Sequence, residues 1–422
     1  MEKSKKRKIN VTDIVLYSIL ILIIILLIIY ICINNKNKYV ETEKPTIIDS
    51  KGFNNTIIHE FNKNSENKNY MISPYSLEVV LAMLRDGAEG GTYQELVNLI
   101  GTRSIESFYA KERINIANGL FIKQGFNVND EYKNIVSKNY NSEVIYDRFE
   151  NPNVINNWVK EKTFGMIPKA MDEVSKDFVM AIGNAVAIDV KWKSAFKCVN
   201  TKVKKFNTLD NDTVNVAMMH NSYENGTAYY EDDNATYVSI PYLTYDEDGN
   251  IANKGVSLEF IGILPDENVN EFISTYNFND LGNILSKMEV ANEELTVNVD
   301  LPRFKFNNDF NNLSDMLKDL GLKETLGSNP KFTKITNESV FISNFIHKTF
   351  IDLNEAGTKA AAVTLATFDK NSIVTTKPKE VNISFDKPFV YLIKDKNSNE
   401  ILFFGVIYEP DEYNSITCEE EK

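Results

Sequence analysis

The segment near the C-terminus, NEAGTKAAAVTLATFDKNSIVTT (354–376), contains an unusual run of small residues. In an extended chain, every second side chain points to the same face. One face of this segment would then carry only small side chains, namely those of Thr358, Ala360, Ala362, Thr364 and Ala366. Such a face predicts a strand that fits a narrow slot between other strands. A short helix is the alternative, because Ala, Leu and Lys also favour helix.

The sequence around this segment predicts helices first and strands later. Leu77, Val80, Leu81 and Leu84 recur at helical spacing, in a stretch opened by Ser73-Pro74 and ending at Gly87. Runs rich in Val, Ile, Phe and Tyr, typical of strands, occupy 181–192, 256–265, 295–306 and 384–395. Mixed helices and largely antiparallel strands without an interdomain break predict one large α+β domain.

The composition indicates a packed protein with an acidic body. The chain has 422 residues, 43% hydrophobic and 25% charged, and a net charge of −13. Residues 1–40 hold seven of the 46 basic residues and two of the 59 acidic ones, which leaves 39 and 57 and a net charge of −18 for the remainder. Such a body repels polyanions, so we expect no nucleic-acid partner.

The cysteines and histidines are few and scattered. Cys32, Cys198 and Cys418 are far apart and form no CxxC pair, so the spacing indicates neither a disulfide framework nor a thiolate zinc site. The chain has only three histidines. We therefore expect no metal site and no cofactor.

The N-terminal region predicts a membrane anchor. Residues 14–33 are almost all Ile, Leu, Val and Tyr, and 20 residues of helix span a hydrocarbon core of about 30 Å. A cluster of five basic residues precedes this stretch, so 1–13 should be a cytoplasmic tail, 34–50 a linker, and 51–422 a domain outside the cytoplasm. A cleavable signal peptide is the alternative, although its apolar part is usually shorter.

Motifs of known enzymes are almost absent. The tetrapeptide Ser65-Glu66-Asn67-Lys68 matches the S-x-x-K pattern of penicillin-binding and β-lactamase-like enzymes. It lies in the polar run NKNSENKN, without the accompanying Ser-Asp-Asn or Lys-Thr-Gly motif. The sequence has no G-x-S-x-G elbow, H-E-x-x-H pair or glycine-rich phosphate loop. We therefore predict that the protein is not an enzyme and keep this enzyme class as a remote alternative.

Residues 50–410 closely resemble the serpins, the serine protease inhibitor superfamily. The segment NEAGTKAAAVT (354–364) is similar to the family hinge Asn-Glu-x-Gly-Thr-x-Ala-Ala-Ala-x-Thr. The segment FDKPFVYLIKDKNSNEILFFGVIYEP (385–410) is similar to the family's C-terminal signature. Further similar motifs follow the family order, at 70–96, 184–192, 301–306 and 341–358.

The resemblance implies three β-sheets, eight or nine helices and a reactive-centre loop at about 355–379, exposed above a five-stranded main sheet. It also implies a protease inhibitor that acts as a suicide substrate: the protease cleaves the loop, and the hinge inserts into the main sheet while the acyl-enzyme is trapped. The hinge comprises Glu355, Gly357, Thr358, Ala360, Ala361, Ala362 and Thr364. A non-inhibitory serpin with a binding or chaperone role is the alternative, although the small hinge residues favour inhibition.

Individual residues match family positions. The polar cluster beneath the opening of the main sheet corresponds to Ser73, Ser76, Asn184 and His347. Trp192 matches the tryptophan at the top of that sheet, and Arg303 and Glu355 match the basic and acidic partners there. A surface ion pair worth little is the alternative for Arg303 with Glu355.

The cleaved bond is predicted by counting along the hinge. If Glu355 is residue one, the seventeenth is Asn371, which gives Asn371–Ser372 as the reactive bond, with Lys370–Asn371 as the alternative. Asn371 would suit an asparagine-directed cysteine protease and Lys370 a trypsin-like serine protease. Phe368 would suit a chymotrypsin-like protease and is the least favoured of the three. We expect a monomer whose partner is a protease of one of these classes.

Overall fold

The computed structural model describes residues 50–418, except for 106–107, 311, 343–346 and 359–377. The chain divides into two units, 1–46 and 47–422, and the described residues belong to the second. The expected tail, anchor (14–33) and most of the linker lie outside them. Within the described ranges, no helix combines the length and the apolar character that a membrane span requires.

Eight α-helices form within the described residues. They are α2 (Ser50–Lys63), α3 (Pro74–Gly87), α4 (Gly90–Ile100), α5 (Asp130–Tyr140), α6 (Asn153–Lys162), α7 (Val269–Thr275), α8 (Leu281–Leu285) and α9 (Leu313–Asp319), with short 3-10 turns η1 (Cys198–Asn200) and η2 (Phe278–Asp280). The predicted helix is confirmed as α3. Ser73 caps it by accepting the Ser76 N–H, and Pro74 occupies its first turn, where a missing N–H costs nothing.

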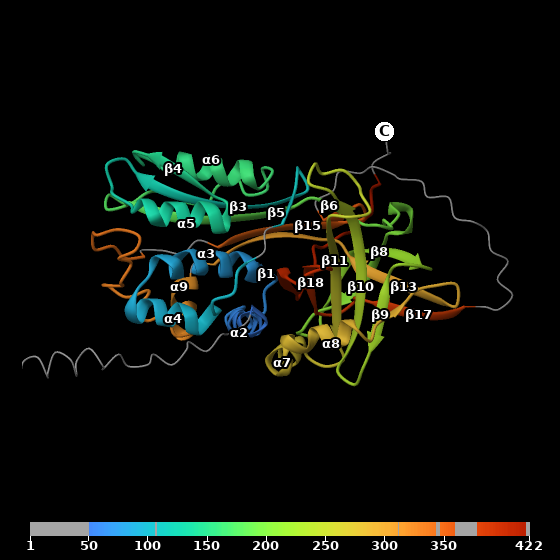
Figure 1. The fold of residues 1–422 in the computed structure, drawn as a ribbon. Helices are drawn as coiled ribbons and strands as arrows, with labels where there is room; N and C mark the ends of the chain where they lie inside the picture. Colours follow the sequence, from blue (N-terminus) through green and yellow to red (C-terminus); the bar gives the residue numbers. More distant parts are fainter. Residues whose placement is uncertain (1–49, 106–107, 311, 343–346, 359–377, 419–422) are drawn as a thin grey trace, which may run out of the picture. The chain divides into compact units, whose positions relative to one another are not determined.

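Two sheets form the half of the domain that contains α7 and α8 (Figure 1). The larger has the order β1 (Tyr70–Ile72), β19 (Ile401–Ile407), β18 (Phe389–Asp395), β11 (Val256–Pro265), β10 (Ala235–Tyr245), β9 (Ala228–Glu231), β12 (Glu289–Val290). The smaller has the order β17 (Lys379–Ser384), β13 (Leu295–Pro302), β8 (Thr213–Tyr223), β7 (Lys202–Asn207). All residues of β18 and β19 are buried, so these strands form the centre of the core.

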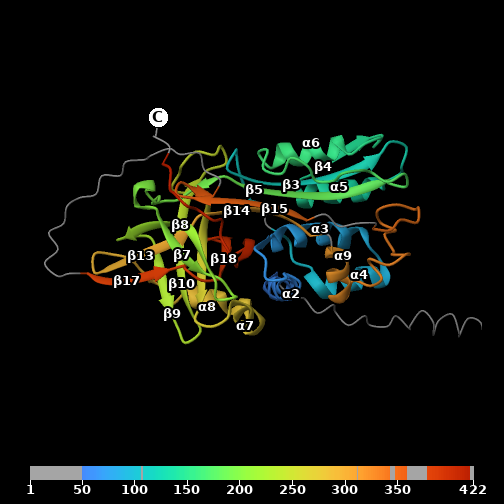
Figure 2. The same cartoon turned by 180° about the vertical axis from the view of Figure 1, so that it is seen from behind.

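The main sheet consists of two sets of hydrogen-bonded strands. The two sets are connected where the chain passes from a strand of one into a strand of the other. One set is β2 (Tyr109–Ala110), β3 (Ile114–Lys123) and β4 (Ser142–Asp147), with β5 (Met180–Ile188) paired along β3. The other is β14 (Phe304–Asp309), β15 (Lys348–Asn354), β16 (Gly357–Thr358) and β6 (Val190–Lys191). Because β5 leads almost directly into β6, the two sets run side by side, with α3 on one face and α6 on the other (Figures 1 and 2).

Strand boundaries differ from the predictions at three places. The predicted strand 181–192 is divided by Asp189 into β5 and β6. The predicted strand 384–395 is wrong at its start: β17 ends at Ser384, and β18 begins only at Phe389, after Pro388, which lacks a backbone donor. The predicted strand 295–306 is divided by Arg303 into β13 and β14. Arg303 thus lies where the chain passes from β13 of the smaller sheet to β14 of the main sheet.

Candidate functional site

The first residues of the predicted hinge already lie in the main sheet. After a turn at Glu355 and Ala356, Gly357 and Thr358 pair with the end of β15 on one side and with β6 on the other. Gly357 has φ +155°, and a Cβ there would lie 2.1 Å from the Val190 carbonyl oxygen, so only glycine fits. We expected the hinge to enter the sheet only after cleavage. For these two residues the structure corrects that expectation.

Thr358 is held by an aromatic pair. Its side chain is only 3% exposed, and its hydroxyl lies 2.7 Å from the Tyr242 hydroxyl. The Tyr242 ring stacks on Trp192 with 4.4 Å between ring centroids. The Trp192 indole N–H donates to the Asn354 carbonyl oxygen at 2.9 Å. Trp192 therefore contacts the hinge turn, a contact that the resemblance did not specify. Tyr242 had no sequence signal beyond its place in an apolar strand.

Arg303 and Glu355 form a partly buried ion pair. Arg303 Nε lies 2.9 Å and 2.7 Å from the two carboxylate oxygens of Glu355, and Nη2 donates to the same carboxylate. The Thr201 hydroxyl donates to Glu355 Oε1 at 2.5 Å. The two charged side chains are only 18% and 13% exposed, so this is not the surface pair considered above. Removing one partner would leave a partly buried charge without its main partner, which is unfavourable.

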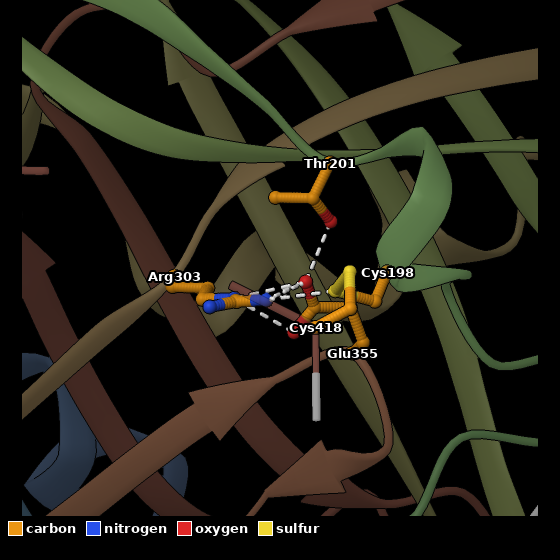
Figure 3. Close-up of a disulfide and its surroundings, with 5 residues drawn as sticks. All are labelled: Cys198, Thr201, Arg303, Glu355 and Cys418. Atoms are coloured by element: carbon orange, nitrogen blue, oxygen red, sulfur yellow. Dashed lines mark hydrogen bonds and ion pairs between the residues drawn. A yellow bond between two sulfur atoms is a disulfide. The ribbon is translucent and has the colours of Figure 1, made fainter. Parts of the chain in front are cut away.

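A disulfide lies directly beside this ion pair (Figure 3). It joins Cys198 to Cys418, whose Cα atoms are 5.8 Å apart although 220 positions separate them in the sequence. Arg303 Nη2 lies 3.6 Å from Cys198 Sγ. The expectation from cysteine spacing is therefore wrong for this pair, because the fold, and not the sequence interval, brings the two sulfurs together.

The predicted polar cluster is assembled beneath β5 and β15. The Ser73 N–H donates to His347 Nε2 at 3.1 Å, and the Ser76 hydroxyl donates to Asn184 Oδ1. Asn184 Nδ2 donates at 2.7 Å to Asn118 Oδ1, so the network extends to β3. Asn118 was not predicted, since an isolated Asn in an apolar strand carries no motif.

Burial lowers the pKa of His347 to about 4, so this imidazole is neutral at physiological pH. Its Nε2 atom accepts the Ser73 N–H, so protonation there would also remove a hydrogen bond. A cavity of about 400 Å³ extends along β5 from this cluster, and its lining includes Leu77, Trp158 and Ile182. The cluster thus lies at the edge of unfilled space in the sheet layer.

The remaining predicted residues divide into two groups. Hinge and reactive-bond positions fall outside the described residues, namely Ala360, Ala361, Ala362, Thr364, Lys370, Asn371 and Ser372. The S-x-x-K tetrapeptide lies in the turns after α2, where Lys68 pairs with Glu66 at 2.6 Å and both side chains are about three-quarters exposed. Ser65 donates to the Asn62 carbonyl oxygen. This exposed turn lacks the buried helix start that a serine nucleophile of that class requires.

Comparison with known proteins identifies the family. A sequence model described as Serpin (serine protease inhibitor) matches residues 49–410. The chain belongs to the serpin family. An uncharacterized serpin-like protein of Thermococcus kodakarensis is 31% identical, over 87% of this chain and 86% of its own length. Serpins are mostly protease inhibitors and not enzymes.

Solved serpin structures share the fold. The crystal structure of tengpin, a thermophilic serpin in the native state, matches with a TM-score of 0.70 and 26% identity, over 87% of this chain and 96% of that one. Thyroxine-binding globulin in complex with thyroxine matches with the same TM-score and 23% identity, over 86% and 98%. At that identity the second likeness shows the fold alone. The predicted α+β serpin fold is confirmed.

Proposed function

We propose that this serpin inhibits proteases by inserting its hinge into the main sheet. The observation that carries the proposal is the position of Thr358, which is already buried between β15 and β6 and leads into the small-residue segment 359–366. The next residues would continue between the two halves of the sheet. The cavity along β5 offers space on that path.

The free energy expected from such an insertion is comparable with the stability of a protease domain. If about ten residues paired on both sides, on the order of 20 hydrogen bonds at roughly 0.5–1 kcal/mol each would contribute on the order of 10 kcal/mol or more. A typical domain is stabilised by roughly 5–15 kcal/mol, so insertion could distort a bound protease. The loop would be cleaved at Asn371–Ser372 or at Lys370–Asn371.

The test is to incubate the full-length protein with a panel of asparagine-directed cysteine proteases and trypsin-like serine proteases. Inhibition should appear as a covalent complex that survives denaturing electrophoresis. Sequencing of the new N-terminus then locates the bond: a start at Ser372 identifies Asn371 as the attacked residue, and a start at Asn371 identifies Lys370. Cleavage of the loop by every protease without any complex would favour the non-inhibitory role, which the thyroxine-binding relative makes the second candidate.

We further propose that residues 14–33 anchor the protein in a membrane, with the serpin domain outside the cytoplasm. The basic cluster before the apolar stretch supports this orientation. The Cys198–Cys418 disulfide also supports it, since disulfides persist mainly in oxidising compartments. Protease treatment of intact cells should cut the loop. Protection of the loop until the membrane is permeabilised would contradict the orientation.

A further inference from the structure

The C-terminal segment 409–418, which we call the tail, crosses the top of the main sheet after β19. The Tyr413 N–H donates to the Asn215 carbonyl oxygen at 2.8 Å. Asp411 Oδ2 accepts the backbone N–H of Lys305 at 3.1 Å. The tail is therefore bound to β8 and β14 before it ends at the disulfide.

The segment from Trp192 to Thr201, which we call the cap, covers the turn that precedes the seated hinge residues. The Trp192 N–H donates to the Ala356 carbonyl oxygen, and the Phe196 N–H donates to the Glu355 carbonyl oxygen, both at 3.0 Å. The Thr201 hydroxyl holds the Glu355 carboxylate. Three hydrogen bonds from the cap thus fix the two residues about which the hinge turns into the sheet.

The disulfide joins the cap to the tail, because Cys198 lies in the cap and Cys418 ends the tail. We propose that this bond is a redox-controlled latch on the hinge. When it is formed, it holds the cap on the Glu355–Ala356 turn and keeps Gly357 and Thr358 seated. When it is reduced, the cap loosens and the hinge is seated less often. The proposal rests on the inhibitory function proposed above.

The bond is accessible to thiol–disulfide exchange with a dithiol reductant. Cys418 is exposed, whereas Cys198 is partly buried. A thiolate of the dithiol attacks Cys418 Sγ, the S–S bond breaks, and its electron pair leaves on Cys198 Sγ, where the Arg303 guanidinium stabilises the thiolate. The second thiol of the reductant then displaces the Cys418 thiolate, which takes up a proton. The dithiol ends as a disulfide, and the protein gains two electrons.

Reduction also changes the charges around Arg303. In the oxidised protein its guanidinium is paired with the Glu355 carboxylate (Figure 3). A thiolate at Cys198 adds a second anion to the same guanidinium, and the two compete for its N–H donors. Reduction therefore weakens two interactions of Glu355: its hydrogen bonds to the cap and its ion pair with Arg303.

The experiment uses the full-length chain with Cys32→Ser, in mild detergent, so that Cys198 and Cys418 are the only cysteines. Dithiothreitol serves as the dithiol. Hydrogen exchange at the Trp192 and Phe196 amides reports the cap without any protease, and we expect reduction to raise it about fivefold or more, the effect of losing one hydrogen bond. The number of inhibitor molecules consumed per protease inactivated should rise about twofold or more, because slower insertion lets deacylation compete.

Reoxidation of the same sample should restore both values. A variant that also carries Cys198→Ser and Cys418→Ser should resemble the reduced protein with or without dithiothreitol. If reduction left amide exchange unchanged, the latch proposal would be overturned. A decrease on reduction, either in amide exchange or in the number of inhibitor molecules consumed per protease, would also overturn it. If exchange rises as expected but no protease is inhibited in either state, the latch stands and the inhibitory function proposed above is overturned.

Discussion

Thr358 is the residue on which hinge insertion depends most directly, because its side chain is already inside the sheet against Tyr242. Thr358→Arg would place a charge in this buried space at a cost of roughly 2–5 kcal/mol. We expect the loop to be cleaved at the same bond and at similar speed, while the inhibitor consumed per protease inactivated rises by about tenfold or more. Thr358→Ser keeps the hydroxyl and is the matched control. Full inhibition by Thr358→Arg would contradict the insertion mechanism.

His347 makes the stability of the fold depend on pH. Its pKa is about 4 in the folded protein and about 6.5 when exposed, so between these values the unfolded chain binds a proton that the folded chain does not. Above pH 6.5 the imidazole is neutral in both states, and the contribution of His347 to stability is complete. As the pH falls from 6.5 towards 4, the free energy of unfolding decreases by about 3 kcal/mol from this residue.

Urea unfolding at several pH values checks this dependence. Carboxylates titrate in the same range, so the comparison is with His347→Gln, whose amide oxygen can still accept the Ser73 N–H. The variant should lose less stability than the wild type between pH 6.5 and 4.5. Parallel curves for the two proteins would show that His347 does not titrate as described.

The contribution of the Arg303–Glu355 ion pair to stability can be tested with two substitutions. Arg303→Gln leaves the carboxylate without its main partner and should lower the free energy of unfolding by about 1–3 kcal/mol. Adding Glu355→Gln removes the orphaned charge and should recover most of this loss, as measured by denaturant titration of the single and double variants. Equal destabilisation by the single and double changes would mean that the charge on Glu355 is not the cause.

Secondary-structure elements were predictable where the signal is local. The helix α3 follows from apolar spacing and from Ser73-Pro74, and β11 has the bounds 256–265 that the sequence indicated. A strand that includes Thr358 was predicted, but the sequence did not indicate that β16 is already paired within the main sheet. Two residues pair there because Val190 and Leu353, distant in the sequence, present open edges to them.

In the functional site, too, residues in local motifs were predictable and long-range contacts were not. The resemblance to the family identified Trp192, Arg303 and the polar cluster, because these residues lie in recognisable motifs. Asn118, Tyr242 and the Cys198–Cys418 bond were missed, since each depends on a contact between segments that are far apart in the sequence and carry no motif. Long-range contacts of this kind are visible only in the folded chain.

The main sheet should become more stable when the hinge extends β16. Cleavage of the reactive loop frees the hinge to continue along β5 and to add ladder hydrogen bonds on both sides. Calorimetry should therefore give the cleaved protein a higher unfolding temperature than the intact one. The matched control is cleaved Thr358→Arg, which should gain less. An equal unfolding temperature before and after cleavage of the wild type would argue against strand insertion.

The Cys198–Cys418 disulfide closes residues 198–418 into one long covalent loop. A loop of this length lowers the entropy of the unfolded chain, and its contribution to stability is about 5 kcal/mol in the loop-closure estimate. Cys198→Ser with Cys418→Ser should reduce the free energy of unfolding by up to that amount, measured by denaturant titration without reductant. Addition of dithiothreitol should destabilise the wild type and leave the double variant unchanged, and equal stability of the two oxidised proteins would contradict this contribution.

The same disulfide determines whether the two products of loop cleavage separate. The predicted cut near residue 371 lies between Cys198 and Cys418, so the piece that follows the cut, with β17, β18 and β19, stays tethered to the rest. After cleavage of the loop, the two parts of the chain remain one covalent molecule, so denaturing electrophoresis without reductant shows a single band of unchanged mass. The C-terminal fragment separates only after the disulfide is reduced. Its presence in a sample without added reductant would therefore show that the cleaved inhibitor had been exposed to reducing conditions.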